Sequence, residues 1–132
     1  MKQIKLLSFG FKYGEPPAAN LLFDMRFLAN PFYVEGLRAL TGADQPVADY
    51  VLTQDAAREF LATLTPLLAT AIAGYIRHGH EHDSITIAFG CTGGKHRSVC
   101  MTLRAAEIVR DILSQLCIDP QVLIEHRDLG RE

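Results

Sequence analysis

Short apolar runs along the chain are separated by longer segments in which apolar residues recur every three or four positions. The runs at 4–9, 21–24, 84–89 and 122–124 are rich in branched and aromatic side chains, and they predict strands. The run at 84–89 is β-branched with few charges, which is the pattern of a central strand. It ends directly at a glycine-rich loop.

Two helices are predicted from the same pattern. The first spans 60–76, where one helical face is formed by Phe60, Leu61, Leu64, Leu67, Leu68, Ala71, Ile72, Tyr75 and Ile76. The second spans 99–116. Pro66 either kinks the first helix or lies in the first turn of a new one with Thr65 as its cap, and the sequence leaves both open. Strands separated by helices indicate an α/β fold, with residues 1–132 forming a single three-layer domain around a mostly parallel sheet.

Composition limits the chain to one core and a weak overall electrostatic field. The 132 residues suffice for one ordinary domain, and 48% hydrophobic with 21% charged residues is typical of a globular chain. The formal net charge is −2, from 13 basic and 15 acidic residues. Any binding of nucleic acid would therefore depend on a local basic patch.

The cysteine pattern and the absence of targeting signals indicate a cytoplasmic protein. Cys91, Cys100 and Cys117 are odd in number and lack the spacing of a metal site. The sequence contains no signal peptide and no apolar run of about 18 residues. We therefore expect reduced thiols and no association with a membrane.

Three alternating histidines, His78, His80 and His82, are interpreted as part of a solvated loop. Alternation would place all three on one side only in an extended segment, and this segment links a helix to a strand. We expect no metal site here and no cofactor elsewhere in the chain.

The loop at 90–98 carries the chemistry that the sequence reveals. A strand, a glycine-rich loop and a helix start place backbone amides and a positive helix end around an anion. The loop also supplies two glycines for close approach, two hydroxyls, a histidine donor, a lysine charge and an arginine fork for phosphate oxygens. Positive side chains at a helix start oppose the helix dipole, which favours a bound anion. The predicted ligand residues are Thr92, Gly93, Gly94, Lys95, His96, Arg97 and Ser98.

Two known phosphate loops are close to this one. A Walker A loop needs four residues between its glycines and a hydroxyl after its lysine, whereas Gly90 precedes Gly94 by only four positions and His96 replaces the hydroxyl. The loop also matches the signature of cysteine-dependent phosphatases, in which a thiolate attacks phosphorus: Cys91 is separated by five residues from Arg97. Gly90 replaces the usual histidine of that signature, and no downstream loop supplies an obvious acid. A cysteine phosphatase using Cys91 and Arg97 stays open as the alternative function.

Several stretches resemble the C-terminal domain of the RNase adapter protein family RapZ. They follow the family's order and cover nearly the whole chain: 8–14, 23–31, 40–42, 90–99 and 126–129. The resemblance implies a non-catalytic adapter domain that binds glucosamine-6-phosphate and small regulatory RNAs, contacts an RNase and assembles with copies of itself. The family's Walker-containing domain is expected to be absent, because the first strand begins close to Met1.

The resemblance also implies residue roles. The ligand site would be lined by Thr92, Gly93, His96 and Arg97, with Asp24 facing it from a strand end, where ligands of open α/β sheets gather. Alternatively, Asp24 pairs with Arg26, which is counted with the ligand residues.

A basic patch for RNA would include Lys12, Arg104 and Arg127. Phe32 replaces the family's histidine, and the chain ends 130–132 without a basic tail. Both departures weaken the expectation of RNA binding more than that of sugar-phosphate binding.

Overall fold

The computed structural model of the chain describes residues 1–78 and 83–131. In this part the strands are β1 (Gln3–Gly10), β2 (Leu21–Asp24), β3 (Ser84–Cys91) and β4 (Gln121–His126). They form one sheet in the order β2-β3-β1-β4, and every neighbouring pair is parallel. The predicted α/β class and parallel sheet are confirmed. His80 and His82 lie outside the described residues, and the remainder holds no cluster of three or more metal-ligating side chains.

The helices are α1 (Gln45–Leu52), α2 (Asp55–Arg77) and α3 (Arg97–Gln115), with short 3-10 turns η1 (Phe11–Tyr13) and η2 (Pro31–Tyr33). Both long helices were predicted, whereas α1 was not. It has eight residues and buries only Val47 and Val51, which is too little periodicity to recognise.

The two possibilities for Pro66 are resolved in favour of one continuous helix. Pro66 lies inside α2, and the Thr65 hydroxyl donates to the Leu61 carbonyl one turn earlier at 3.0 Å. Thr65 is therefore an interior residue of α2 and not an N-cap.

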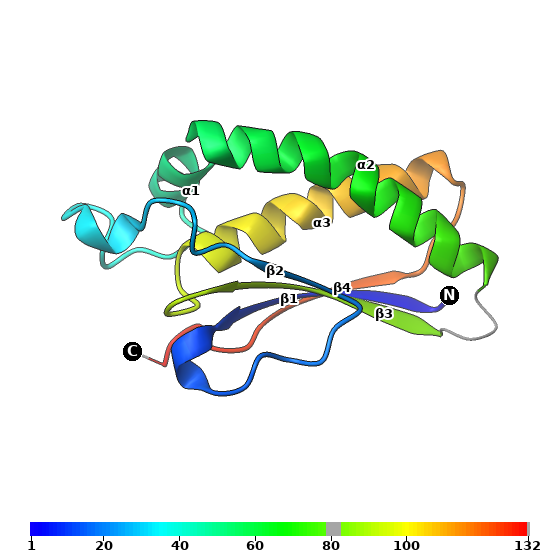
Figure 1. The fold of residues 1–132 in the computed structure, drawn as a ribbon, viewed down its shortest axis with the longest axis horizontal. Helices are drawn as coiled ribbons and strands as arrows, with labels where there is room; N and C mark the ends of the chain where they lie inside the picture. The colour runs from blue at the N-terminus through cyan, green and yellow to red at the C-terminus, as the bar shows by residue number, and fades with distance from the viewer. Residues whose placement is uncertain (79–82, 132) are drawn as a thin grey trace.

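All three helices lie on one face of the sheet (Figure 1). The main core fills the space between them and includes Ile4, Ile87, Leu68 and Met101, all fully buried. The opposite face carries a smaller cluster of Leu7, Phe9 and Ala88, against which Phe11 and Ala19 pack. That face is covered by the segment between β1 and β2, which begins with the 3-10 turn η1 and contains no α-helix.

Helix α2 is apolar enough to pass a test for membrane spans. By length and composition alone it is able to cross a membrane, with a mean hydropathy of 1.4 over an 18-residue window. The same helix buries Leu64, Leu68 and Ile72 in the core, and core helices of soluble proteins pass the same test.

The register of the strands brings three chain segments together at one end of the sheet. Gly10 is paired with Cys91, and Asp24 is paired with Gly90. The carboxyl ends of β1, β2 and β3 therefore meet beside the start of α3, as expected for the ligand-binding edge of a parallel sheet.

Candidate functional site

The glycine-rich loop lies directly against the end of β1. Gly94 has φ +68°, a conformation that favours glycine, and a Cβ atom there would lie 2.8 Å from the Gly10 nitrogen. A Cβ on Gly10 would in turn lie 2.6 Å from the carbonyl carbon of Gly93. The loop conformation therefore depends on Gly10 as well as on its own glycines.

The same loop is held from the other side by the segment before α1. The Gly42 amide donates to the Lys95 carbonyl at 2.9 Å. A Cβ on Gly42 would overlap the His96 carbonyl and the Cys100 amide. Gly42 thus allows its segment to pack on the first turn of α3, which explains one of the motifs noted in the sequence.

A cavity of about 300 Å³ opens in front of the loop. Its loop side is formed by Cys91, Thr92, Gly93, Lys95, His96 and Arg97. Its other side is formed by Lys12 of η1 and by Asn30, Phe32, Tyr33 and Arg38 around η2. Of the predicted ligand residues, Thr92, Gly93, Lys95, His96 and Arg97 line this cavity, whereas Gly94 and Ser98 are buried behind it.

Two buried nitrogens of the cavity residues have no hydrogen-bond partner. These are His96 Nε2 and Arg97 Nε, the unpartnered buried side-chain atoms of the described residues, and their side chains are only 5% and 4% exposed. The Arg97 guanidinium is held in place by Nη1, which donates to the carbonyls of Leu28 at 2.9 Å and Arg26 at 3.2 Å. Buried polar atoms normally have partners, so these two nitrogens indicate a ligand.

Burial is the main cause that lowers the pKa of His96, and the charge of Lys95 lowers it further. Backbone carbonyls of Leu37, Arg38 and Leu40 act in the opposite direction. His96 is therefore neutral at pH 7, and one ring nitrogen then carries a proton while the other accepts.

The Cys91 thiol has one neighbour that a cysteine phosphatase would need, the hydroxyl of Ser98. Its thiol lies 3.1 Å from the Ser98 hydroxyl, and the Ser98 amide points at its sulfur at 3.4 Å. However, the thiol belongs to a residue that is 2% exposed. The histidine of that enzyme class does not fit at Gly90 either, because even a Cβ there would overlap the rings of Phe9 and Phe11.

Asp24 and Arg26 pair with each other, as the alternative interpretation held. Arg26 donates from Nη2 to Asp24 Oδ2 at 2.6 Å, and its guanidinium stacks 3.9 Å from the centre of the Phe11 ring. The Arg26 hydrogen bond is the main cause that lowers the pKa of Asp24, and the charge of Arg97 adds a smaller effect. Neither Asp24 nor Arg26 lines the cavity.

The three residues predicted for RNA binding lie in different settings. Lys12 is exposed at the cavity, and its Nζ reaches over Gly93. Arg104 pairs with Glu107 of the same helix, α3, at 2.7 Å. Arg127 is engaged by Asp128, with 2.9 Å between Nη2 and Oδ2. The structure does not bring the three side chains into one unpaired patch.

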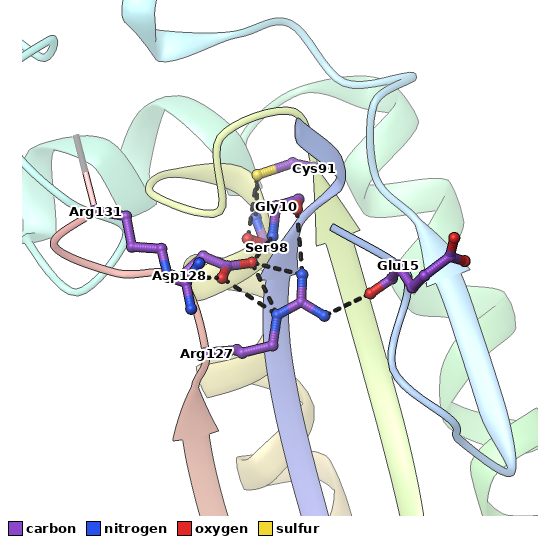
Figure 2. A network of polar contacts seen from close by, with 7 residues as sticks. All are labelled: Gly10, Glu15, Cys91, Ser98, Arg127, Asp128 and Arg131. Carbon is purple, nitrogen blue, oxygen red and sulfur yellow. Dashed lines mark hydrogen bonds and ion pairs between the residues drawn. The ribbon is translucent and has the colours of Figure 1, made fainter. Parts of the chain in front are cut away.

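Asp128 supports the glycine-rich loop through Gly10, and its role was not identified from the sequence. Figure 2 shows its carboxylate between Gly10, Arg127 and Arg131. The carboxylate is fully buried and accepts a 2.7 Å hydrogen bond from the Gly10 amide. It also pairs with Arg127 and, at 3.3 Å, with Arg131 Nε. Burial is the largest single effect on the pKa of Asp128 and raises it, but the hydrogen bonds from Arg127 and Gly10, together with the charges of Arg127 and Arg131, lower the pKa overall.

The far wall of the cavity was also missed. Asn30 had been noted as a turn signal, but its Oδ1 accepts from the Phe32 amide at 3.1 Å and thereby sets the η2 turn. Tyr33 and Arg38 carry no sequence signal of their own. Only the contact of this turn with a loop about sixty residues away reveals them.

Comparison with known proteins supports the family resemblance over the whole chain. The RapZ C-terminal domain matches residues 2–130. A "nucleotide-binding protein" of Clavibacter michiganensis is 47% identical over 132 residues, which cover 98% of this chain and 42% of that protein. Proteins of the same name from Acidothermus cellulolyticus and Rhodococcus jostii are 49% and 50% identical, over 96% and 98% of this chain and 40% of each relative.

The chain thus spans about two fifths of the length of the curated relatives it matches. The matched part includes the cavity, the glycine-rich loop and the Asp128 support. The chain belongs to the RapZ C-terminal domain family.

Proposed function

We propose that the chain is a non-catalytic sensing and adapter domain whose cavity binds a phosphate-bearing ligand of the glucosamine-6-phosphate type. The observation that carries the proposal is the pair of buried, unpartnered nitrogens on His96 and Arg97 in a cavity at a helix start. The first amides of a helix have no carbonyl partners within it, so they complement a phosphate. Lys12 and Lys95 add positive charge at the cavity.

An RNA partner, an RNase partner and self-association form the second part of the proposal. This part is supported by membership of the RapZ C-terminal domain family rather than by the geometry. Because the chain covers about two fifths of its relatives, the activities of those longer proteins are not transferred. The relatives' name, nucleotide-binding protein, refers to them as whole proteins.

Phosphatase chemistry is not proposed. The Cys91 thiol is buried, Gly90 leaves no room for a histidine, and the comparisons give the activity no support.

Isothermal titration with glucosamine-6-phosphate, glucosamine and inorganic phosphate tests the ligand proposal. Binding of the phosphorylated ligands but not of glucosamine is expected, and no heat with any phosphorylated ligand would overturn the proposal. Arg97→Ala should weaken binding by about 1.5–3 kcal/mol if the arginine makes a charge-assisted contact. Because Arg97 also holds the Leu28 carbonyl, a variant that does not disturb the fold is needed as well.

Lys12→Ala is that variant. Lys12 is exposed, and its ammonium makes no ion pair within the described residues. Its loss should weaken phosphate binding by about 1 kcal/mol, which is typical of a partly solvated charged contact. Lys2→Ala is the matched control, since Lys2 is also exposed but lies outside the cavity lining. Equal effects of the two variants would mean that only net charge matters.

A further inference from the structure

The Cys91 sulfur lies where β3 meets the start of α3. Cys91 is the last residue of β3 and belongs to the lining of the cavity in front of the glycine-rich loop. Because the residue is 2% exposed, only a small reagent such as hydrogen peroxide would reach its thiol, and it would do so through the cavity. Cys100 is also 2% exposed but belongs to the main core, and Cys117 is exposed beyond the end of α3.

The Cys91 sulfur takes the place of a helix cap. His96, the residue before α3, makes no side-chain cap hydrogen bond within the described residues. The Ser98 amide instead points at the Cys91 sulfur at 3.4 Å, and the Ser98 hydroxyl lies 3.1 Å from the same atom (Figure 2). Amides at a helix start lack partners within the helix, and a thiol sulfur is a weak acceptor for them. A negative charge or an oxygen atom at this position would satisfy the amide better.

The two buried cysteines therefore differ in their chemistry. A thiolate at Cys91 would accept from both Ser98 donors, and it would lie at the positive end of α3. Burial is the cause that acts on Cys100, and it raises the pKa of that thiol to about 12. Since the thiolate is the form of cysteine that reacts, Cys91 is the buried cysteine expected to react in the folded chain.

The same cavity holds donors that no protein group satisfies. His96 Nε2 and Arg97 Nε are buried without partners, and both residues line the cavity together with Cys91. When a thiolate attacks a peroxide, negative charge develops on the oxygen that departs. Donors fixed in a site from which water is largely excluded complement such a charge. The cavity thus combines a sulfur held by two donors with free donors for an oxygen.

From this arrangement we infer that Cys91 is a site of reversible oxidation by hydroperoxides. The sulfur attacks one oxygen of hydrogen peroxide, an S–O bond forms as the O–O bond breaks, and the departing hydroxide takes the thiol proton and leaves as water. Cys91 is oxidised to a sulfenic acid, and the peroxide is reduced to water. Two thiols of an added reductant reverse the step and yield the Cys91 thiol, the disulfide of the reductant and water.

Oxidation of Cys91 would also change the anion site. This consequence rests on the proposed function, because it places a phosphate and the sulfenic oxygen at the same donors. Bound inorganic phosphate should therefore slow the oxidation, and the oxidised chain should bind phosphate less tightly than the reduced chain.

Peroxide treatment of the Cys117→Ser chain, followed by trapping with dimedone and peptide mass spectrometry, tests the inference. The substitution removes the exposed thiol, so Cys91 is compared with the equally buried Cys100. Dimedone should label Cys91 roughly tenfold faster than Cys100 in the folded chain, and the two cysteines should react alike in urea. Dithiothreitol added before dimedone should prevent the labelling. Equal labelling of the two cysteines in the folded chain, or labelling of Cys91 only in urea, would overturn the inference.

Ser98→Ala in the same background tests the hydroxyl contact. It should slow the labelling of Cys91 roughly two- to tenfold, the range expected of one hydrogen bond. Ser8→Ala is the matched control, because Ser8 is equally buried and its hydroxyl lies 2.6 Å from Nδ1 of His126. The control should leave the rate within about twofold. Equal slowing by the two variants would contradict the role given to Ser98.

Inorganic phosphate separates this inference from the proposed function. If calorimetry shows phosphate binding to the reduced chain, but phosphate neither slows the labelling nor binds less tightly after oxidation, Cys91 does not act on the anion site. If phosphate does not bind at all, the proposed function fails, and the contrast between Cys91 and Cys100 still decides whether Cys91 is the oxidation site.

Discussion

Replacing Asp128 by alanine tests how far the end of the chain holds the glycine-rich loop. The substitution removes the acceptor of the Gly10 amide and the carboxylate that pairs with Arg127 and Arg131. A buried amide left without an acceptor costs about 1–3 kcal/mol. Removing one partner of a fully buried ion pair costs about 3–5 kcal/mol.

The free-energy cost of removing this ion pair should be smaller than that range. The Arg127 side chain is 26% exposed and also donates to the Glu15 carbonyl at 2.7 Å, so its charge is not stranded. We therefore expect Asp128→Ala to lower the free energy of unfolding by about 3 kcal/mol. At roughly 4 °C per kcal/mol for a chain of this size, the midpoint of thermal unfolding should fall by about 12 °C. Asp128→Asn keeps an oxygen for Gly10 and should lose about half as much.

Urea and thermal unfolding of the unaltered chain, Asp128→Ala and Asp128→Asn measure these losses of stability. Glu107→Ala is the control, because it removes an exposed carboxylate paired with Arg104, and such surface pairs are worth about 0–1 kcal/mol. Phosphate affinity of Asp128→Asn at 25 °C should also fall, since Gly10 packs against Gly93 and Gly94. If Asp128→Ala lowers the free energy of unfolding no more than Glu107→Ala does, the Asp128 carboxylate does not support the loop.

Four further predictions follow from particular groups. Gly94→Ala should destabilise the chain by about 1–3 kcal/mol in urea unfolding, because its φ of +68° and its contact with Gly10 exclude a side chain. A thiol reagent at pH 8 should label the exposed Cys117 quickly and Cys100 only on unfolding, since burial raises the pKa of Cys100 to about 12. Burial lowers the folded-state pKa of His96 and His126 below 6.5, so the unfolded chain binds more protons; stability measured from pH 7.5 to 5 should therefore fall as pH drops through 6.5, and unchanged stability would contradict those pKa shifts. A monomer should bind RNA weakly, and mobility shifts across a salt series would contradict this if a demonstrated monomer bound with nanomolar affinity at physiological salt.

The glycine-rich loop could be predicted from the sequence because its parts are contiguous. A strand, two glycines, a lysine, a histidine and an arginine follow one another within 84–98, and the structure brings five of the predicted residues to one cavity. The sheet was predictable for a similar reason, since its buried strands are short continuous apolar runs. Helix α1 was not predictable, because only Val47 and Val51 mark its buried face.

The support and the far wall depend on contacts between distant residues. Asp128 and Gly10 are 118 positions apart, and Lys95 and Arg38 are 57 apart. Neither contact leaves a local pattern. Asp24, in contrast, is determined by a local contact. Its position at a strand end was predicted correctly, but its carboxylate pairs with Arg26, two residues away.

The pairing of the basic residues explains how a chain of net charge −2 could offer the anion site proposed above. Arg26, Arg104 and Arg127 each lie against a carboxylate, so their charges are largely balanced within the protein. The cavity residues Lys95 and Arg97 instead donate to backbone carbonyls, which hold the side chains in place without cancelling their charge. Partial burial reduces screening by salt, so the positive field of these two residues is concentrated at the start of α3. The described basic residues that no carboxylate balances thus include these two at the cavity, and under the proposed function an RNA phosphate would have to compete there with the small ligand.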